Sequence, residues 1–437
     1  MSNIIPDVTH PHDMPYCIWH PDVATEDTYR KLSARYPELR YQVGRACAVA
    51  GYVDLYKELD LLPDVHIAEE ARDNGCAEIY DIIMDQPDKY SVMNDYTRTI
   101  NLHNPQKACL NGDTAVRSSL EVKQAHSRDF KSTHYFDITE DMSIDTDTTP
   151  ARESSSDVTP LLYSPLPADL PTVDKDLLIL IAAYYGDIDR YVRLRRPIMI
   201  NNEYIFIIRG IFHNTMFAKW WSLQDLTKDD RRLDDGRKLT AIQSRIERAV
   251  SVRFIMNNDL SRIFSKPDTA PGCIWYPTLA CPDTYRELAK RMPRMAGRVA
   301  RACIVGNFEH IYRDLPDFKP TRPMMREAME SHNPFFLEDL RRRAVEHGID
   351  PYSLSDRRYA YDDIYPTVRQ AHEVSTERLD KKLGAFSVSA GTDFDNVYNG
   401  YACGSSAVEV SLCTRWWKKE DYQYFETCIR RGVPAGV

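Results

Sequence analysis

The chain contains a long internal repeat, and this feature restricts its fold more than any other. Shifting the sequence by 256 residues aligns Cys17–Leu59 with Cys273–Leu315 without a gap, and 19 of the 43 aligned positions are identical. Differences such as Tyr52 against Phe308 preserve size, as expected where a position occupies the same packing environment twice. We therefore expect an internal tandem duplication in which both segments form the same structural unit.

Apolar residues within the aligned segments recur at the spacing of an α-helix. Val43, Ala46, Cys47 and Ala50 precede Gly51 in this pattern, and a second apolar series follows the glycine. We predict two short antiparallel helices around this turn. Similar breaks occur at Gly75, Gly186, Gly306, Asn214 and Asn333. A series of such hairpins predicts an all-α fold in which each hairpin buries its apolar face against its neighbours.

A weaker similarity, which requires gaps, extends the repeat beyond these segments. Asp174-Lys175-x-Leu177 resembles Asp380-Lys381-x-Leu383, so we interpret the chain as two unequal copies, of which the first carries an insert. The predicted regions are helical repeat block A (14–102), an insert (103–173), block B (174–265), block A′ (272–365), which is a copy of A, and block B′ (366–437), which is a partial copy of B.

The insert differs in composition from the helical blocks. Residues 137–157 contain seven acidic residues and one arginine among many serines and threonines, and residues 164–172 contain three prolines. A segment this polar cannot bury enough apolar surface to form a core, so we predict a mostly disordered linker. Serines among acidic residues are open to kinases, and we consider Ser154, Ser155 and Ser156 to be candidate phosphorylation sites.

Charge and hydropathy exclude several classes of protein. The chain has 56 basic and 65 acidic side chains and a net charge of −9, which disfavours a broad nucleic-acid or anionic-membrane surface. The longest strongly apolar run, Leu177–Tyr185, is too short to span a bilayer, and the first twenty residues lack the pattern of a secretory signal. Ten cysteines occur without a CxxC pair. We therefore expect reduced thiols, no membrane association, and an intracellular location that is cytoplasmic or nuclear.

Parts of the sequence resemble the ankyrin repeat family. Ile179–Ile188 is similar to the first helix and turn of an ankyrin repeat, and Glu346–Pro351 is similar to the end of one. Arg430–Pro434 is a fainter version of that end, and Leu177–Leu180 stands where the family has Thr-Pro-Leu-His. The resemblance implies an irregular ankyrin-like helical-hairpin solenoid that binds another protein along its helices and loops.

Two groups of reactive residue types were weighed as chemical sites. His10, His12 and His20 lie near Cys17, but the second segment has Tyr276 in place of His20 and no counterpart of the other histidines, so we expect no metal site. The recurring cysteines suit small buried apolar side chains rather than nucleophiles, and they are Cys17, Cys273, Cys47 and Cys303. No familiar catalytic motif occurs, so we predict no catalytic residues and no cofactor.

A basic helix face distinguishes the second segment from the first. Arg294, Arg298 and Arg301 share one face of a predicted helix, which would allow them to bind phosphate or RNA. The first segment has Glu38 and Gln42 at two of these positions. We interpret the arginines as a solvated helix face and keep an acidic partner of the second segment alone as the alternative.

Paired tryptophans are the candidate partner-binding residues, namely Trp220, Trp221, Trp416 and Trp417. Adjacent residues of a helix point about 100° apart, so two large rings can scarcely both be buried. We expect one ring of each pair to pack inside and the other to serve as a candidate anchor for a partner, since tryptophan is enriched in interface hot spots.

The sequence therefore predicts a non-enzymatic scaffold or adaptor that uses an ankyrin-like helical surface to bind another protein. The alternative is an enzyme or regulatory subunit with an unrecognised pocket between repeat blocks. The identity of the partner, the pathway, the oligomeric state and the question of whether the two copies form one groove stay open at the level of sequence.

Overall fold

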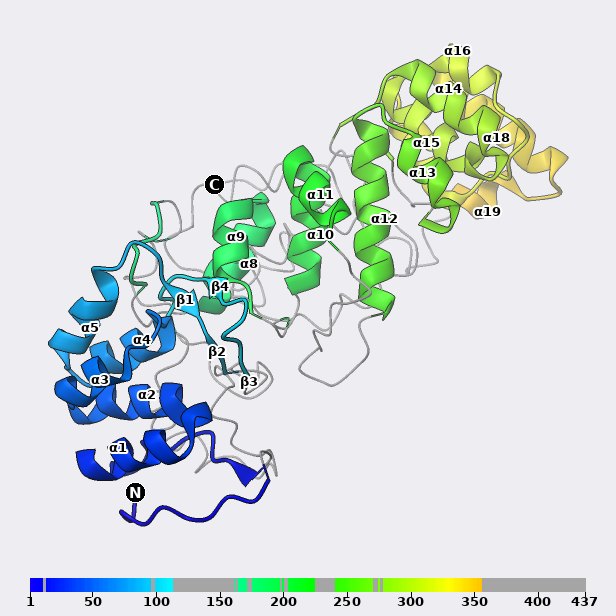
Figure 1. Cartoon of the computed structure of the whole chain (residues 1–437). Coiled ribbons are helices and arrows are strands. Elements are labelled where there is room, and N and C mark those ends of the chain that lie inside the picture. The colour runs from blue at the N-terminus through cyan, green and yellow to red at the C-terminus, as the bar shows by residue number, and fades with distance from the viewer. Residues whose placement is uncertain are drawn as a thin grey trace, which may run out of the picture. The chain divides into compact units, whose positions relative to one another are not determined.

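The computed structural model shows a largely helical chain that clusters into two compact units (Figure 1). The first unit comprises Met1–Asp145 and Ser164–Lys175, and the second comprises Thr146–Tyr163 and Asp176–Val437. None of the described helices is both long and apolar enough to cross a membrane. The structure describes residues 1–10, 13–95, 99–112, 161, 164–170, 175–196, 199, 203–224, 240–269, 274–275 and 278–355.

The first unit consists of helical hairpins followed by four very short strands. Its helices are α1 (Glu26–Arg35), η2 (Pro37–Leu39), α2 (Arg40–Ala50), α3 (Val53–Leu59), α4 (Val65–Asp73) and α5 (Ala77–Met84). Its strands are β1 (Tyr90–Ser91), β2 (Met93–Asn94), β3 (Thr99–Ile100) and β4 (Gln106–Lys107). The predicted helices on either side of Gly51 are therefore confirmed as α2 and α3.

Local sequence explains where these helices begin and end. Thr25 caps α1 and Asp64 caps α4 by accepting backbone N–H bonds with their side chains. Gly51 ends α2 in the left-handed region at φ 76°, which a side chain would disfavour. α2 packs against both α3 and α4, and α4 packs against α5, so the hairpins contact their neighbours in chain order.

The strands form two small antiparallel sheets, which the all-α prediction did not include. β1 pairs with β4, and β2 pairs with β3. Leu110, which follows β4, is fully buried and forms a parallel bridge with Asp169. The Glu69 carboxylate accepts the backbone N–H groups of Asn111 and Gly112 at 2.7 and 3.0 Å.

Both described ends of the predicted insert thus pack against the first unit. The Asp169 carboxylate accepts a hydrogen bond from Tyr80 at 2.9 Å and forms an ion pair with Arg72. Ser154, Ser155, Ser156 and the rest of the acidic stretch lie outside the described residues, as does predicted block B′.

The second unit begins with longer helices and continues into a region that repeats the order of α1–α5. The first group is α8 (Lys175–Tyr185), α9 (Ile188–Leu194), α10 (Glu203–His213), α11 (Thr215–Ser222) and α12 (Thr240–Met256). The remaining helices are α13 (Ser261–Ser265), η3 (Pro267–Thr269), α14 (Pro282–Arg291), η4 (Pro293–Met295), α15 (Ala296–Gly306), α16 (Glu309–Arg313), α17 (Arg322–Glu330), α18 (Pro334–Glu346) and α19 (Pro351–Ser355).

α10 lies beside α12 in a layer that resembles the packing of α2 against α4 (Figure 1). Gly210 of α10 permits a close approach to the preceding helix, because a Cβ atom there would lie 2.0 Å from the Ala183 carbonyl oxygen. Asn214 and Asn333, which were predicted to replace glycine in turns, instead have extended backbones and cap α11 and α18 through their side chains.

The second unit contains a near copy of the polar contacts that organise the first helices. We refer to residues 1–112 as the first segment and to residues 258–355 as the second segment. Tyr29 donates a hydrogen bond to the Ile18 carbonyl at 2.7 Å, and Tyr285 donates one to the Ile274 carbonyl at 2.8 Å. Asn307, aligned with Gly51, ends α15 in the left-handed region at φ 55°.

Candidate functional site

The two tryptophans of α11 differ in burial. Trp221 is 1% exposed, whereas Trp220 is half-buried. The Trp220 ring stacks on Phe217 at a centroid distance of 6.0 Å, and Tyr191 meets its ring edge-on at 6.0 Å. The Arg195 guanidinium lies 5.1 Å from the Trp220 ring centroid. Trp416 and Trp417 lie outside the described residues.

Exposed apolar side chains accompany Trp220 on α11 and on the neighbouring helix α9. Met216, Trp220 and Leu223 follow one another at intervals of four and three residues, so they share one side of α11. Met216 is 65% exposed and Leu223 is 71% exposed. Val192 of α9, which packs against α11, is 44% exposed. We call Met216, Trp220, Leu223 and Val192 the α11 strip.

The histidines and cysteines weighed as chemical sites can be compared with their positions in the structure. No group of three or more His, Cys, Asp and Glu side chains able to hold a metal is found among the described residues. Cys47 and Cys303 are fully buried, which confirms the prediction for these two, and burial raises the pKa of each thiol to about 12. Cys17 is half-buried, whereas Cys273 lies outside the described residues.

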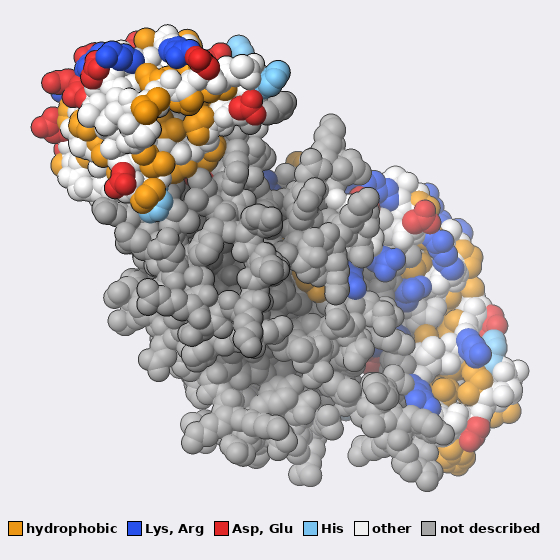
Figure 2. Space-filling view, turned by 90° about the horizontal axis from the view of Figure 1, so that it is seen from below, with side chains coloured by type: hydrophobic (Ala, Val, Ile, Leu, Met, Phe, Trp, Pro, Cys, Tyr) orange, Lys and Arg blue, Asp and Glu red, His pale blue; other side chains and the backbone are white. Residues whose placement is uncertain are grey.

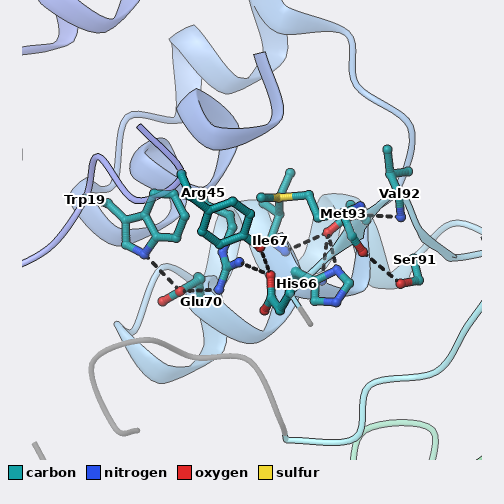
Figure 3. Close-up of polar contacts among 11 residues, drawn as sticks. Trp19, Arg45, His66, Ile67, Glu70, Ser91, Val92 and Met93 are labelled. Atoms are coloured by element: carbon teal, nitrogen blue, oxygen red, sulfur yellow. Dashed lines mark hydrogen bonds and ion pairs between the residues drawn. The ribbon is translucent and has the colours of Figure 1, made fainter. Parts of the chain in front are cut away.

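A buried polar cluster in the first unit centres on Arg45, which was not predicted from the sequence as a site. Arg45 of α2 is fully buried and forms ion pairs with Glu70 of α4 and with Asp95, which follows β2, each at 2.8 Å. The Trp19 indole N–H donates to the same Glu70 oxygen at 3.0 Å. Figure 3 shows Arg45 and Trp19 both reaching Glu70.

Aromatic side chains complete the surroundings of Arg45. Its guanidinium carbon lies 4.5 Å from the centroid of the Trp19 ring, which is a cation–π distance. Tyr16 donates a hydrogen bond to Asp95. Burial, and after it the negative charge of Asp95, raises the pKa of the Tyr16 hydroxyl far above its usual value, so this hydroxyl stays protonated.

A second buried ion pair continues the cluster toward the strands. The Asp64 carboxylate accepts backbone N–H bonds from His66 and Ile67 at the start of α4 and from Val92 and Met93 beside β2 (Figure 3). Its oxygen also lies 3.2 Å from Nδ1 of His66. One carboxylate thus joins the first turn of a helix to the strands.

The charge states of this pair follow from burial and mutual attraction. Burial alone would lower the pKa of His66, but the charges of Asp64 and Asp95 outweigh it and raise the pKa to about 9. Burial alone would raise the pKa of Asp64, but the His66 charge and the backbone N–H groups lower it. Each buried charge therefore has a counter-charge within the cluster, which suits a structural role better than proton transfer.

The second segment preserves the centre of this cluster. Arg301 forms an ion pair with Glu327 at 2.7 Å, and its guanidinium carbon lies 4.4 Å from the Trp275 ring centroid. Arg301 and Trp275 align with Arg45 and Trp19 at the shift of 256 residues. Glu327 matches Glu70 only at a shift of 257, so a gapless alignment hides the partner of the arginine.

The arginines predicted to share a helix face divide into two kinds. Arg301 points into the core and belongs to the cluster just described. Arg294 is exposed and Arg298 is half-buried. The simple interpretation of a solvated face therefore fits Arg294 but not Arg301.

One comparison with known proteins gives a match. A family model described as the YKP1 C-terminal domain matches residues 19–127 and 275–364, which together make up less than half of the chain. The two matches begin at Trp19 and Trp275, the tryptophans that stack on the buried arginines. No curated protein and no solved structure matches this chain.

Proposed function

We propose that the protein is a non-enzymatic scaffold or adaptor that binds another protein through the α11 strip. The observation that carries this proposal is the exposure of Met216 and Leu223 on either side of Trp220. A partner that covers three large apolar side chains on one surface helix removes their apolar surface from water, which favours binding.

Buried aromatic side chains beneath the α11 strip favour a role in recognition. Phe217 and Trp221 are buried, and Tyr191 packs against both rings. A rigid aromatic base holds Trp220 in place before a partner arrives, which lowers the entropy cost of binding.

We further propose that the chain arose by tandem duplication and that its hairpins form an irregular, ankyrin-like helical solenoid. The double match to one family model, the similar order of helices in the two segments, and the contacts between successive hairpins support this proposal. An intracellular location, cytoplasmic or nuclear, is part of the same proposal. It is supported by the six described cysteines, which are all free thiols.

The test compares full-length wild-type protein with the double variant M216E/L223E as bait in quantitative affinity purification with mass spectrometry. We expect at least one partner to be retained by the wild type and lost from the variant. Val345→Glu is the matched control, because Val345 is 65% exposed and lies on another helix, so this variant should retain the partner. A deletion of residues 113–160, which leaves the packed ends of the insert in place, tests whether the insert contributes.

Two tryptophan variants sharpen this experiment. Trp221→Ala removes a buried ring and should destabilise the second unit by about 3–5 kcal/mol, whereas Trp220→Ala should weaken partner binding with a smaller loss of stability. Thermal unfolding separates the two effects. If M216E/L223E and Trp220→Ala both bind every partner as the wild type does, the proposed role of the α11 strip is wrong.

A further inference from the structure

A group of arginines in the second unit is not explained by the contacts that stabilise the fold. Arg294 of η4 and Arg298 of α15 are four residues apart, and Arg248 comes from α12. Burial, and after it the positive charges of Arg294, Arg248 and Arg301, lower the pKa of Arg298. Arg298 is half-buried, and the arginines whose charges act on it belong to η4, α12 and α15.

The fold holds these elements together through the short helix η3. The Arg294 guanidinium donates a hydrogen bond to the Pro267 carbonyl at the start of η3. Thr269 at the end of η3 bonds the hydroxyl of Ser251 at 2.7 Å, one turn of α12 beyond Arg248. The approach of the arginines is thus part of a packed structure and does not depend on mobile side chains alone.

No described carboxylate forms an ion pair with this group. Among the described residues, Arg248, Arg294 and Arg298 form no ion pair, and the polar contact of Arg298 is a weak one to the Met295 sulfur at 3.8 Å. Other arginines of the second segment do have acidic partners, as Arg301 shows. A half-buried guanidinium among like charges is unfavourable unless an anion occupies the space between them.

We propose that Arg248, Arg294 and Arg298 bind the phosphate group of a phosphorylated side chain on a partner protein. Guanidinium groups match phosphate oxygens with paired hydrogen bonds, and several around one point suit a single dianionic group. Figure 2 is turned about the horizontal axis, so the helices at the right of Figure 1 stay at the right. Lys and Arg side chains gather on the visible face there.

The charges around the group favour a phosphorylated protein over nucleic acid. A nucleic-acid backbone requires a continuous positive stripe, whereas Asp283 and Glu287 lie on the neighbouring helix α14 and the whole chain carries a net charge of −9. The proposal rests on the proposed function in one respect, namely that the phosphate is carried by a partner protein.

The first segment supplies substitutions that test the site. R294E also removes the hydrogen bond to the Pro267 carbonyl, so the effect of R248Q has to agree with it. Glu38 and Gln42 occupy the positions that align with Arg294 and Arg298. R294E and R298Q therefore introduce side chains that the related α2 region already accommodates. Arg248 is exposed, so R248Q offers a third variant that perturbs no core contact.

The experiment measures binding of a fluorescent phosphoserine peptide to the full-length protein, with the unphosphorylated peptide and a single-stranded oligonucleotide as separate probes. We expect the phosphopeptide alone to bind, inorganic phosphate to compete, and R294E/R298Q and R248Q to weaken affinity by about tenfold or more. R286Q is the control, because Arg286 is exposed and already paired with Asp283. Thermal unfolding confirms that each variant is folded.

Several outcomes would overturn this site. Equal binding of the two peptides, or unchanged affinity in both R248Q and R294E/R298Q, would show that the arginines do not recognise phosphate. Tighter binding of the oligonucleotide, lost in the same variants, would assign the group to nucleic acid instead. M216E/L223E should leave phosphopeptide binding unchanged, so failure of the α11 strip and failure of the phosphate site are distinguishable.

Discussion

The first and second segments place the same tryptophan and arginine in their cores but neutralise the arginine differently. Arg45 has two carboxylate partners and is fully buried, and Asp95 comes from the region of the small sheets. The Arg301 side chain is 13% exposed and forms an ion pair with Glu327. The same arrangement of helices therefore accommodates the arginine both fully buried and slightly exposed to solvent.

The two segments also differ in where their additional charged residues lie. The first segment uses its additional acids, Asp64 and Asp95, to connect helices with strands, and its polar groups face inward. The second segment has Thr321 where the first has Asp64, and its additional charges are arginines near the surface. The first segment has more internal polar connections, and the second segment has more arginines near its surface.

Removal of the central arginine should have the largest effect and should differ between the segments. Arg45→Ala leaves two buried carboxylates without their cation and should lower the stability of the first unit by about 3–5 kcal/mol. Arg301→Ala should cost about 1–3 kcal/mol, since its site is partly exposed. Native-state hydrogen exchange of α2 and α15 amides in the full chain measures each loss. Equal losses would contradict the comparison.

Removal of the capping acid should have the next largest effect. Asp64→Ala deprives four backbone N–H groups of their acceptor and should destabilise the first unit by about 2–4 kcal/mol. Thr321 occupies the matching position but makes no capping bond with its side chain, so Thr321→Ala should change stability by less than about 0.5 kcal/mol. Asp64→Asn, which keeps an acceptor oxygen, serves as the intermediate control in chemical denaturation.

A pH titration should distinguish the segments by a smaller effect. The pKa of His66 is raised to about 9 in the folded chain, above the value of about 6.5 expected when unfolded. Its pairing with Asp64 therefore stabilises the first unit fully below about pH 6.5, and this contribution is lost as the pH rises toward 9. The second segment has Pro323 at the matching position.

The variant His66→Gln checks this expectation. In denaturation experiments followed from about pH 6 to pH 10, the wild type should lose stability in the first unit as the histidine deprotonates. His66→Gln should start from a lower stability and show a flatter profile over that range. An identical slope in both proteins would show that another group titrates.

The smallest effect concerns the residue that ends the central helix of each segment. Gly51 adopts φ 76°, so Gly51→Ala should cost about 1 kcal/mol. Asn307→Gly should change stability by only a few tenths of a kcal/mol, because asparagine and glycine both tolerate this conformation. Thermal unfolding of the two variants provides the measurement. A large loss in Asn307→Gly would show that the asparagine side chain has a further role.

Much of the helical architecture follows from sequence, because it depends on local periodicity. The pattern around Gly51 predicts α2 and α3, and the internal repeat predicts their counterparts α15 and α16. The two-residue strands carry no such pattern, since their pairing depends on residues far apart in the chain. The all-α prediction is therefore right in its main part and incomplete near residue 100.

The buried cluster shows why sites are harder to predict than helices. Arg45 and Arg301 were visible as an identical pair, but Arg301 was interpreted together with Arg294 and Arg298 as a solvated helix face, because the first segment has Glu38 and Gln42 at the other two positions. Their acidic partners lie beyond the gapless alignment and are displaced by one residue between the segments. For the α11 pair, helix geometry predicts that neighbouring rings lie on different sides, and in the structure Trp221 is buried whereas Trp220 is half-buried.

The bridge between Leu110 and Asp169 has a consequence for protein engineering. It brings the entry and the exit of the inserted sequence to neighbouring points on the first unit. Excision of residues 113–160 and religation through a short glycine-rich spacer should therefore require little rearrangement of the first unit, and it keeps Leu161, whose carbonyl accepts a hydrogen bond from Arg190. The same junction offers a place for grafting a reporter domain, since the entropy of closing a loop grows only slowly with its length.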